Sequence, residues 1–92
     1  MKTAEILEYL ANWYPEALKA DGFDDAILGI AEGWFGDSQH AVLAYDYDKC
    51  IDILVAQGST REEADEYFSF NTLGAYVGEH TPVFIHNLRG KK

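Results

Sequence analysis

The residues best suited to chemistry in this 92-residue chain are closely spaced carboxylates in the stretch AYDYDKCID. Asp46, Asp48 and Asp52 alternate there in part, as oxygen ligands of a cation would, with Cys50 breaking the series. A calcium loop of the EF-hand type also needs a glycine at its sixth position and a glutamate at its twelfth. Those positions hold Ile51 and Gln57, which disfavours calcium. Acids at a helix start instead accept hydrogen bonds from free amides and meet the positive end of the dipole, so we predict a helix from Asp46.

The three histidines show no local metal motif. His40, His80 and His86 have no His or Cys three to five residues away, so no zinc site is indicated. Glu79 and His80 could form half of an acid–base pair, but no nucleophile motif and no phosphate-binding loop accompanies them. We therefore expect no catalytic residue, no metal and no cofactor, and we expect that the protein is not an enzyme.

The charge is strongly negative. The chain has a formal charge of −9, and four of its seven bases lie near the ends. Between Thr3 and Leu88, three bases oppose all sixteen acids, a balance of −13. Such a chain should repel nucleic acid and anionic membranes and attract basic surfaces. Two interpretations remain open, a solvated surface that confers solubility and a surface that recognises a basic partner.

The length and the single cysteine limit the class of protein. A chain of this size predicts one small domain, residues 1–92, with a frayed basic tail at 89–92. One cysteine cannot form an internal disulfide, which favours a reducing compartment. We find neither an export signal nor an apolar run long enough to span a membrane, and we expect a cytoplasmic protein.

Periodicity and turn signals predict an α+β fold with about four helices. The expected helices run from Thr3 to Pro15, from Asp24 or Asp25 to Trp34, from Asp46 to Gly58 and from Thr60 to near Gly78. Thr60 and Glu63 match the capping box, in which each side chain bonds the backbone amide of the other residue. Cys50 should fill a small space in the core.

Two short apolar runs predict a two-stranded sheet, with strands near 41–45 and 82–86. We expect the helices to cover this pair. Asn71 lies on the apolar stripe of the last helix, so we expect a buried amide that bonds backbone across helices. Gly74 would allow another backbone to approach closely.

Aromatic residues are more numerous than one small core requires, at 14% of the chain. Either most of them lie in the core with wet tyrosine hydroxyls, or some belong to an interface, where Tyr, Trp and Phe are enriched. Tyr47 should point outward from its helix. Tyr47 and Tyr67 are the residues that we expect to anchor a partner.

Several stretches between about residues 24 and 86 resemble small acidic proteins encoded by bacteriophages. They are YDYDKCI at 45–51, TREEA at 60–64, EYF at 66–68, FN at 70–71, GAYVG at 74–78 and TP at 81–82. The resemblance implies expression in the cytoplasm of an infected bacterial host and an accessory role, such as binding a host protein in place of DNA. That family has no assigned activity, so the resemblance implies no site residue.

These observations predict a non-catalytic acidic protein that binds or inhibits a basic host protein, one that handles nucleic acid or acts in defence. The expected interaction surface is acidic and aromatic: Asp46, Tyr47, Asp48, Asp52, Glu62, Glu63, Asp65, Glu66 and Tyr67. The alternative is a homo-oligomer that sequesters a small ligand, such as a nucleotide signal, between subunits. Gly29, Gly33 and Gly74 would permit its close packing, but few bases are present to hold phosphate.

Overall fold

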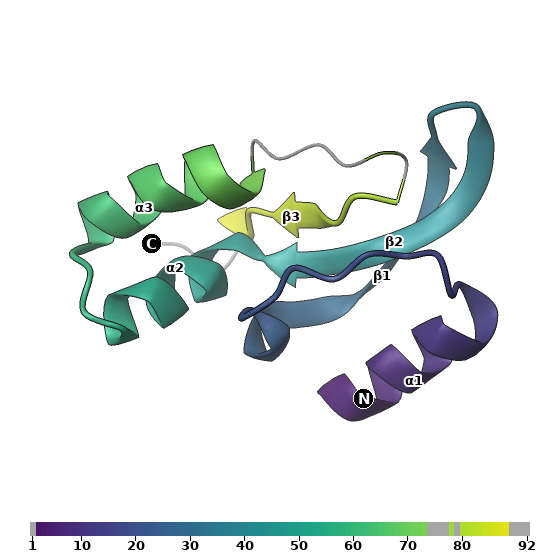
Figure 1. The fold of residues 1–92 in the computed structure, drawn as a ribbon, viewed down its shortest axis with the longest axis horizontal. Helices are drawn as coiled ribbons and strands as arrows, with labels where there is room; N and C mark the ends of the chain where they lie inside the picture. The colour runs from purple at the N-terminus through teal and green to yellow at the C-terminus, as the bar shows by residue number, and fades with distance from the viewer. Residues whose placement is uncertain (1, 74–77, 79, 89–92) are drawn as a thin grey trace.

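Three α-helices and a three-stranded sheet share one core in the computed structural model, which describes residues 2–73, 78 and 80–88 (Figure 1). The α+β class is therefore confirmed. The order along the chain is α1 Thr3–Trp13, a 3₁₀ turn Asp24–Ala26, β1 Ile27–Phe35, β2 Ser38–Asp46, α2 Tyr47–Ala56, α3 Arg61–Phe68, a π-helical turn Ser69–Leu73 and β3 Val83–Ile85.

β2 is the central strand of the sheet, between β1 and β3. β3 pairs with β2 in parallel, with Ala44 opposite Val83 and Tyr45 opposite Phe84. The predicted pairing of the 41–45 and 82–86 strands is thus confirmed, although β2 is longer and β3 shorter than expected. A parallel pair needs a long crossover connection, and α2 and α3 supply it.

The helix predicted between Asp24 and Trp34 is wrong, because most of that segment is the strand β1. β1 and β2 form an antiparallel hairpin in which Phe35 lies opposite Ser38. The turn is Gly36-Asp37, and Gly36 has a φ of 68°. A glycine with positive φ at the first position is typical of a type II′ turn, whose twist matches that of the strands. The apolar spacing of β1 also fits a helix, so periodicity alone was ambiguous.

The predicted first helix is confirmed as α1, with Ile6 and Leu10 buried. Its N-cap is Lys2 rather than Thr3, which is the first helical residue. The carboxylate of Glu5 accepts a hydrogen bond from the Lys2 amide at 3.2 Å and closes the first turn. The helix ends at Trp13, before Pro15, because the residue preceding a proline avoids helical geometry.

The predicted starts of α2 and α3 are both confirmed. Asp46 is the N-cap of α2 and accepts from the Lys49 amide at 3.3 Å. Thr60 and Glu63 form the expected capping box of α3, with hydrogen bonds of 2.9 and 3.1 Å. The helical path continues to Leu73 through the π-helical turn. The rest of the expected helix, including Gly74, and the 89–92 tail lie outside the described residues.

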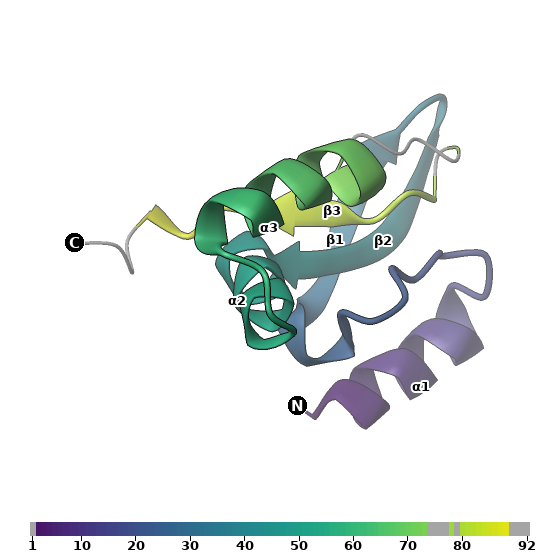
Figure 2. The same ribbon diagram turned by 60° about the vertical axis from the view of Figure 1, so that its left-hand side comes forward.

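Phe68 lies at the centre of the core and is fully buried. Its ring meets those of Phe23, Tyr47 and Phe84 edge-to-face, at centroid distances of 5.4, 5.3 and 4.9 Å. Such contacts favour one fixed geometry in addition to burying apolar area. Figures 1 and 2 show α2 and α3 side by side near the carboxyl ends of β2 and β3, away from α1.

Candidate protein-binding surface

The nine residues predicted to form the interaction surface lie on the adjacent helices α2 and α3 and at the N-cap of α2. We call this region the α2–α3 surface. Between Asp46 and Glu66 the chain has seven acids and two bases, a balance of −5. The packing of α2 against α3 brings the two groups of acids together although they are about ten residues apart in sequence.

Arg61 offsets part of this charge. Its guanidinium lies 2.9 Å from an Asp52 carboxylate oxygen and 3.8 Å from Asp48. The guanidinium and the Asp52 side chain are exposed, so the pair contributes little to stability. Its main effect is to hold two carboxylates of α2 beside the start of α3.

Asp46 and Glu63 are N-terminal capping residues as well as surface acids. Hydrogen bonds from the backbone and side chain of Thr60 lower the pKa of Glu63, so this carboxylate remains charged at more acidic pH than an ordinary glutamate. Oxygens of both side chains accept hydrogen bonds from backbone amides at the helix starts.

Tyr47 does not point outward as predicted. Its side chain is half-buried, its hydroxyl donates to the Asp65 carboxylate and its ring stacks on His86 at a centroid distance of 4.1 Å. Tyr47 therefore links α2, α3 and the segment after β3. These contacts fix the orientation of its ring, and its predicted role as an anchor stays a prediction.

All the members of the predicted set on α3 are exposed: Glu62, Glu63, Asp65, Glu66 and Tyr67. Tyr67 is 54% exposed, the largest apolar side chain on the α2–α3 surface with such exposure. Asp46, Tyr47, Glu63 and Asp65 also make hydrogen bonds within the protein, and contact of the predicted set with a partner stays a prediction.

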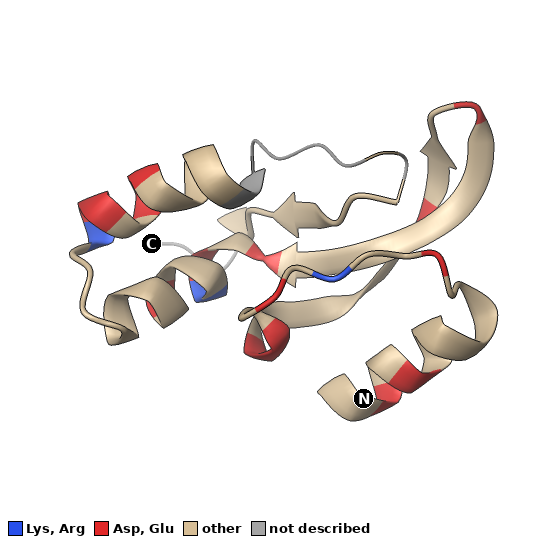
Figure 3. Ribbon diagram, viewed as in Figure 1, with Lys and Arg blue, Asp and Glu red and all other residues tan. Residues whose placement is uncertain are grey.

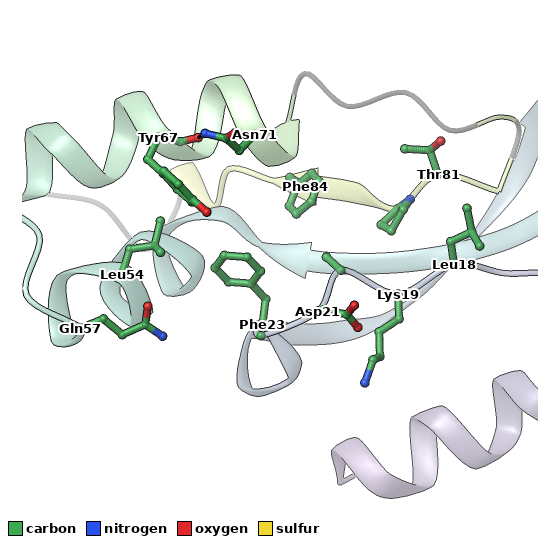
Figure 4. A pocket seen from close by; sticks show the side chains of 13 residues that line it. Leu18, Lys19, Asp21, Phe23, Leu54, Gln57, Tyr67, Asn71, Thr81 and Phe84 are labelled. Carbon is green, nitrogen blue, oxygen red and sulfur yellow. Dashed lines mark hydrogen bonds between the residues drawn. The ribbon is translucent and has the colours of Figure 1, made fainter.

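A groove of about 680 Å³ lies beside Tyr67 (Figure 4). Phe23, Leu54, Phe84 and Tyr67 give it an apolar lining. Phe23 and Phe84 rest on the buried ring of Phe68, so the base of the groove is held by the core. Figure 4 shows these rings between α3 and the connector that precedes β1.

The groove also has polar groups at its margin. Lys19 and Asp21 lie on the connector, Gln57 lies at the end of α2 and Asn71 lies on the π-helical turn. The prediction of a buried Asn71 amide is wrong: Asn71 is exposed, and its Nδ2 donates to the Tyr67 carbonyl at 3.1 Å within its own helical segment. Lys19 pairs with Asp24 at 3.3 Å, which offsets its charge.

Sequence reasoning did not identify the groove, because its lining comes from four separate segments. Phe23 lies in the connector, Leu54 on α2 and Phe84 on β3, and no local pattern joins them. The surplus of aromatic residues was the one signal that pointed toward such a surface.

Acids also occur away from the α2–α3 surface. Figure 3 shows them on α1, on the connector and 3₁₀ turn before β1, and at the tip of the β1–β2 hairpin. The negative charge therefore surrounds much of the molecule. The α2–α3 surface meets the aromatic groove at Tyr67, which lines it, whereas Asp48, Glu62 and Asp65 line a smaller hollow between the two helices.

No cluster of His, Cys, Asp and Glu suited to a metal ion occurs within the described residues. His80 contacts Glu16 at 3.2 Å and lies against the ring of His40 at 4.5 Å. Glu79, which with His80 was considered as half of an acid–base pair, lies outside the described residues. Among the helices that the structure describes, none is long and apolar enough to cross a membrane.

Comparisons with models of protein families, with curated proteins and with solved structures found no match to this chain. The functional interpretation consequently rests on the geometry and charge of the α2–α3 surface and its groove.

Proposed function

We propose that this chain is a non-catalytic binding protein that takes a segment of a basic partner protein on the α2–α3 surface. One apolar side chain of the partner enters the groove, and its neighbouring Lys or Arg residues face the acids of α2 and α3. The observation that carries the proposal is an aromatic groove of about 680 Å³ that Tyr67 shares with the α2–α3 surface, where seven acids oppose two bases.

Apolar burial and electrostatic attraction both contribute to this mode of binding. The groove supplies affinity, because an apolar side chain that enters it leaves water, and hot spots are typically such anchored side chains. The acids supply steering and orientation, which speed association and make it sensitive to salt. The resemblance to small acidic bacteriophage proteins favours a bacterial protein that handles nucleic acid or acts in defence as the basic partner.

Sequestration of a nucleotide in the groove has less support. Of the described residues that line it, Lys19 is the one base, and Asp24 lies against its ammonium group. A nucleotide phosphate needs clustered bases or a helix N-terminus aimed at it. A basic peptide is attracted by the acids of this surface, whereas a phosphate is repelled by them.

A peptide-binding experiment tests the proposal. The probe is a short labelled peptide rich in Lys and Arg with one central Phe, and its partner probe has Ala at that position. We expect the Phe peptide to bind about tenfold more tightly, and Tyr67→Ala to remove most of that difference. Tyr9→Ala on α1 is the matched control, because Tyr9 is also an exposed tyrosine on a helix.

The electrostatic part needs its own variants. Glu66→Lys and Glu8→Lys make the same charge change at exposed positions on α3 and α1. We expect Glu66→Lys to weaken peptide binding at least about threefold more than Glu8→Lys at low salt, and the difference to shrink above about 0.5 M NaCl. Equal effects of the two variants, together with equal affinity for the Phe and Ala peptides, would overturn the proposed function.

A further inference from the structure

β1 is an edge strand in the described sheet, and it has few of the features that prevent edges from pairing. β2 lies on one side of it, and the described sheet has no strand on the other. Edge strands are usually protected by lysine, proline or a bulge. Its nine residues include neither Lys nor Pro, their single charged residue is Glu32, and the one irregularity lies between Ile27 and Gly29 at the start.

Two large apolar side chains of β1 are exposed. Leu28 is 51% exposed and Trp34 is 73% exposed. They lie three residues before and three residues after Ala31, the middle of the strand. Exposed apolar residues on an edge strand are a common feature of interfaces.

We propose that β1 pairs antiparallel with β1 of a second copy of this chain, about a two-fold axis at Ala31. This register places Leu28 opposite Trp34 of the second copy at both ends of the interface. It places Gly29 opposite Gly33 and Ile30 opposite Glu32. The two three-stranded sheets then become one six-stranded sheet with isologous symmetry.

The hydrogen-bonding pattern of the hairpin agrees with this register. Phe35 and Ser38 flank a two-residue turn, so the odd-numbered residues from Gly29 to Phe35 direct their backbone groups toward β2. The even-numbered residues from Ile30 to Trp34 direct theirs outward, and Leu28 lies at the irregularity just before them. The proposed register pairs even-numbered residues with even-numbered residues of the second copy, such as Ile30 with Glu32. The outward-facing backbone groups of the two strands therefore meet and can form hydrogen bonds.

The two neighbouring registers that also pair even-numbered residues with even-numbered residues fit less well. A shift that pairs Glu32 with Glu32 of the second copy puts like charges directly opposite, which is destabilising. A shift that pairs Ile30 with Ile30 leaves Trp34 without an opposite residue on β1. Within each chain the hydroxyl of Tyr14 donates to the Glu32 carboxylate at 3.3 Å. Glu32 therefore already has a hydrogen-bond partner when it lies beside the proposed axis.

Engineered cysteines test the register in the full chain. Gly29 and Gly33 suit this test, because a Cβ at Gly29 meets nothing within 4 Å and one at Gly33 has a single ordinary contact at 3.9 Å. Mild oxidation with diamide should crosslink an equal mixture of Gly29→Cys and Gly33→Cys chains and leave each variant alone uncrosslinked. The native Cys50 is buried and should not react.

The dimer itself is measured by sedimentation at several protein concentrations. Leu28→Lys/Trp34→Lys places two lysine pairs across the interface and should raise the dimer dissociation constant at least about tenfold. Leu28→Lys/Trp34→Glu creates two opposite-charge pairs in the proposed register and should restore most of that loss. Circular dichroism and the urea midpoint confirm that the variants fold.

A wild-type chain that sediments as a monomer at all concentrations would overturn the proposal, as would equal crosslinking of Gly33→Cys alone and of the mixture. Equal dissociation constants for the two double variants would also overturn it. None of these results bears on the α2–α3 surface, so failure here and failure of the proposed function are distinguishable.

Discussion

At the scale of single residues, Cys50 and Tyr45 carry titratable groups that the core buries completely. Burial, with the Asp46 carboxylate nearby, raises the pKa of the Cys50 thiol to about 12. Burial likewise raises the pKa of the Tyr45 hydroxyl to about 12, against the opposing effect of the Ala20 amide, which donates to its oxygen at 2.8 Å. Both groups are therefore held in their neutral forms in the folded chain.

These shifts predict a loss of stability at alkaline pH. Both pKa values are raised on folding, so their stabilisation is complete below the ordinary thiol value of 9.0 and declines as the pH rises toward 12. The thiol alone should give a slope of up to about 1.4 kcal/mol per pH unit in that window. Urea midpoints between about pH 8 and about pH 11 measure it.

Cys50→Ala is the variant that separates titration from packing. It should lower stability at every pH, because it leaves a small cavity, and it should reduce the slope above the ordinary thiol pKa. An unchanged slope in this variant would show that the thiol does not ionise on unfolding as expected.

At the scale of elements, the sequence predicted best where the signal is local. The capping box at Thr60 and the Asp46 cap involve residues three apart, and both starts were placed correctly. β1 was misassigned because Ile27, Ile30 and Trp34 suit a helix as well as a strand, and tertiary pairing with β2 decides between them. Gly36-Asp37 between two apolar runs is typical of a hairpin, and the prediction of a helix up to Trp34 did not use it.

The predicted interaction surface was likewise predictable only in its local features. Its acids could be named from the sequence because charge is a property of each residue. The contacts between Tyr47 and Asp65 and between Arg61 and Asp52 depend on how α2 packs against α3, and no periodicity contains that information. The groove depends on four segments that meet only in the folded chain.

The hairpin turn gives a prediction at this scale. Gly36→Ala should destabilise the protein by about 1–2 kcal/mol, because Gly36 has a φ of 68° and a Cβ is strained in that region. Gly33→Ala is the matched control within β1, where the φ is ordinary and the added Cβ has room. It should be neutral or slightly stabilising. Urea unfolding measures both, and equal losses would contradict the turn assignment.

At the scale of the whole molecule, the charge of −9 is distributed over all the helices and the hairpin tip (Figure 3). Like charges held on a small fold repel one another and destabilise it, and salt screens that repulsion. The two proposed interactions should therefore respond to salt in opposite directions. Binding of a basic peptide weakens as NaCl is added, whereas pairing of two acidic chains strengthens.

The same repulsion predicts how stability depends on salt. Raising NaCl from about 10 mM to about 200 mM should raise the urea midpoint of dilute protein, because the repulsion among sixteen acids exceeds the attraction of the exposed Arg61 pairs that salt also screens. Arg61→Gln makes the chain more negative and should enlarge this rise, whereas Glu66→Lys should reduce it. A midpoint that falls with salt in the wild-type chain would mean that local ion pairs outweigh the overall field, and the electrostatic basis of partner recognition would then have to be sought in those pairs.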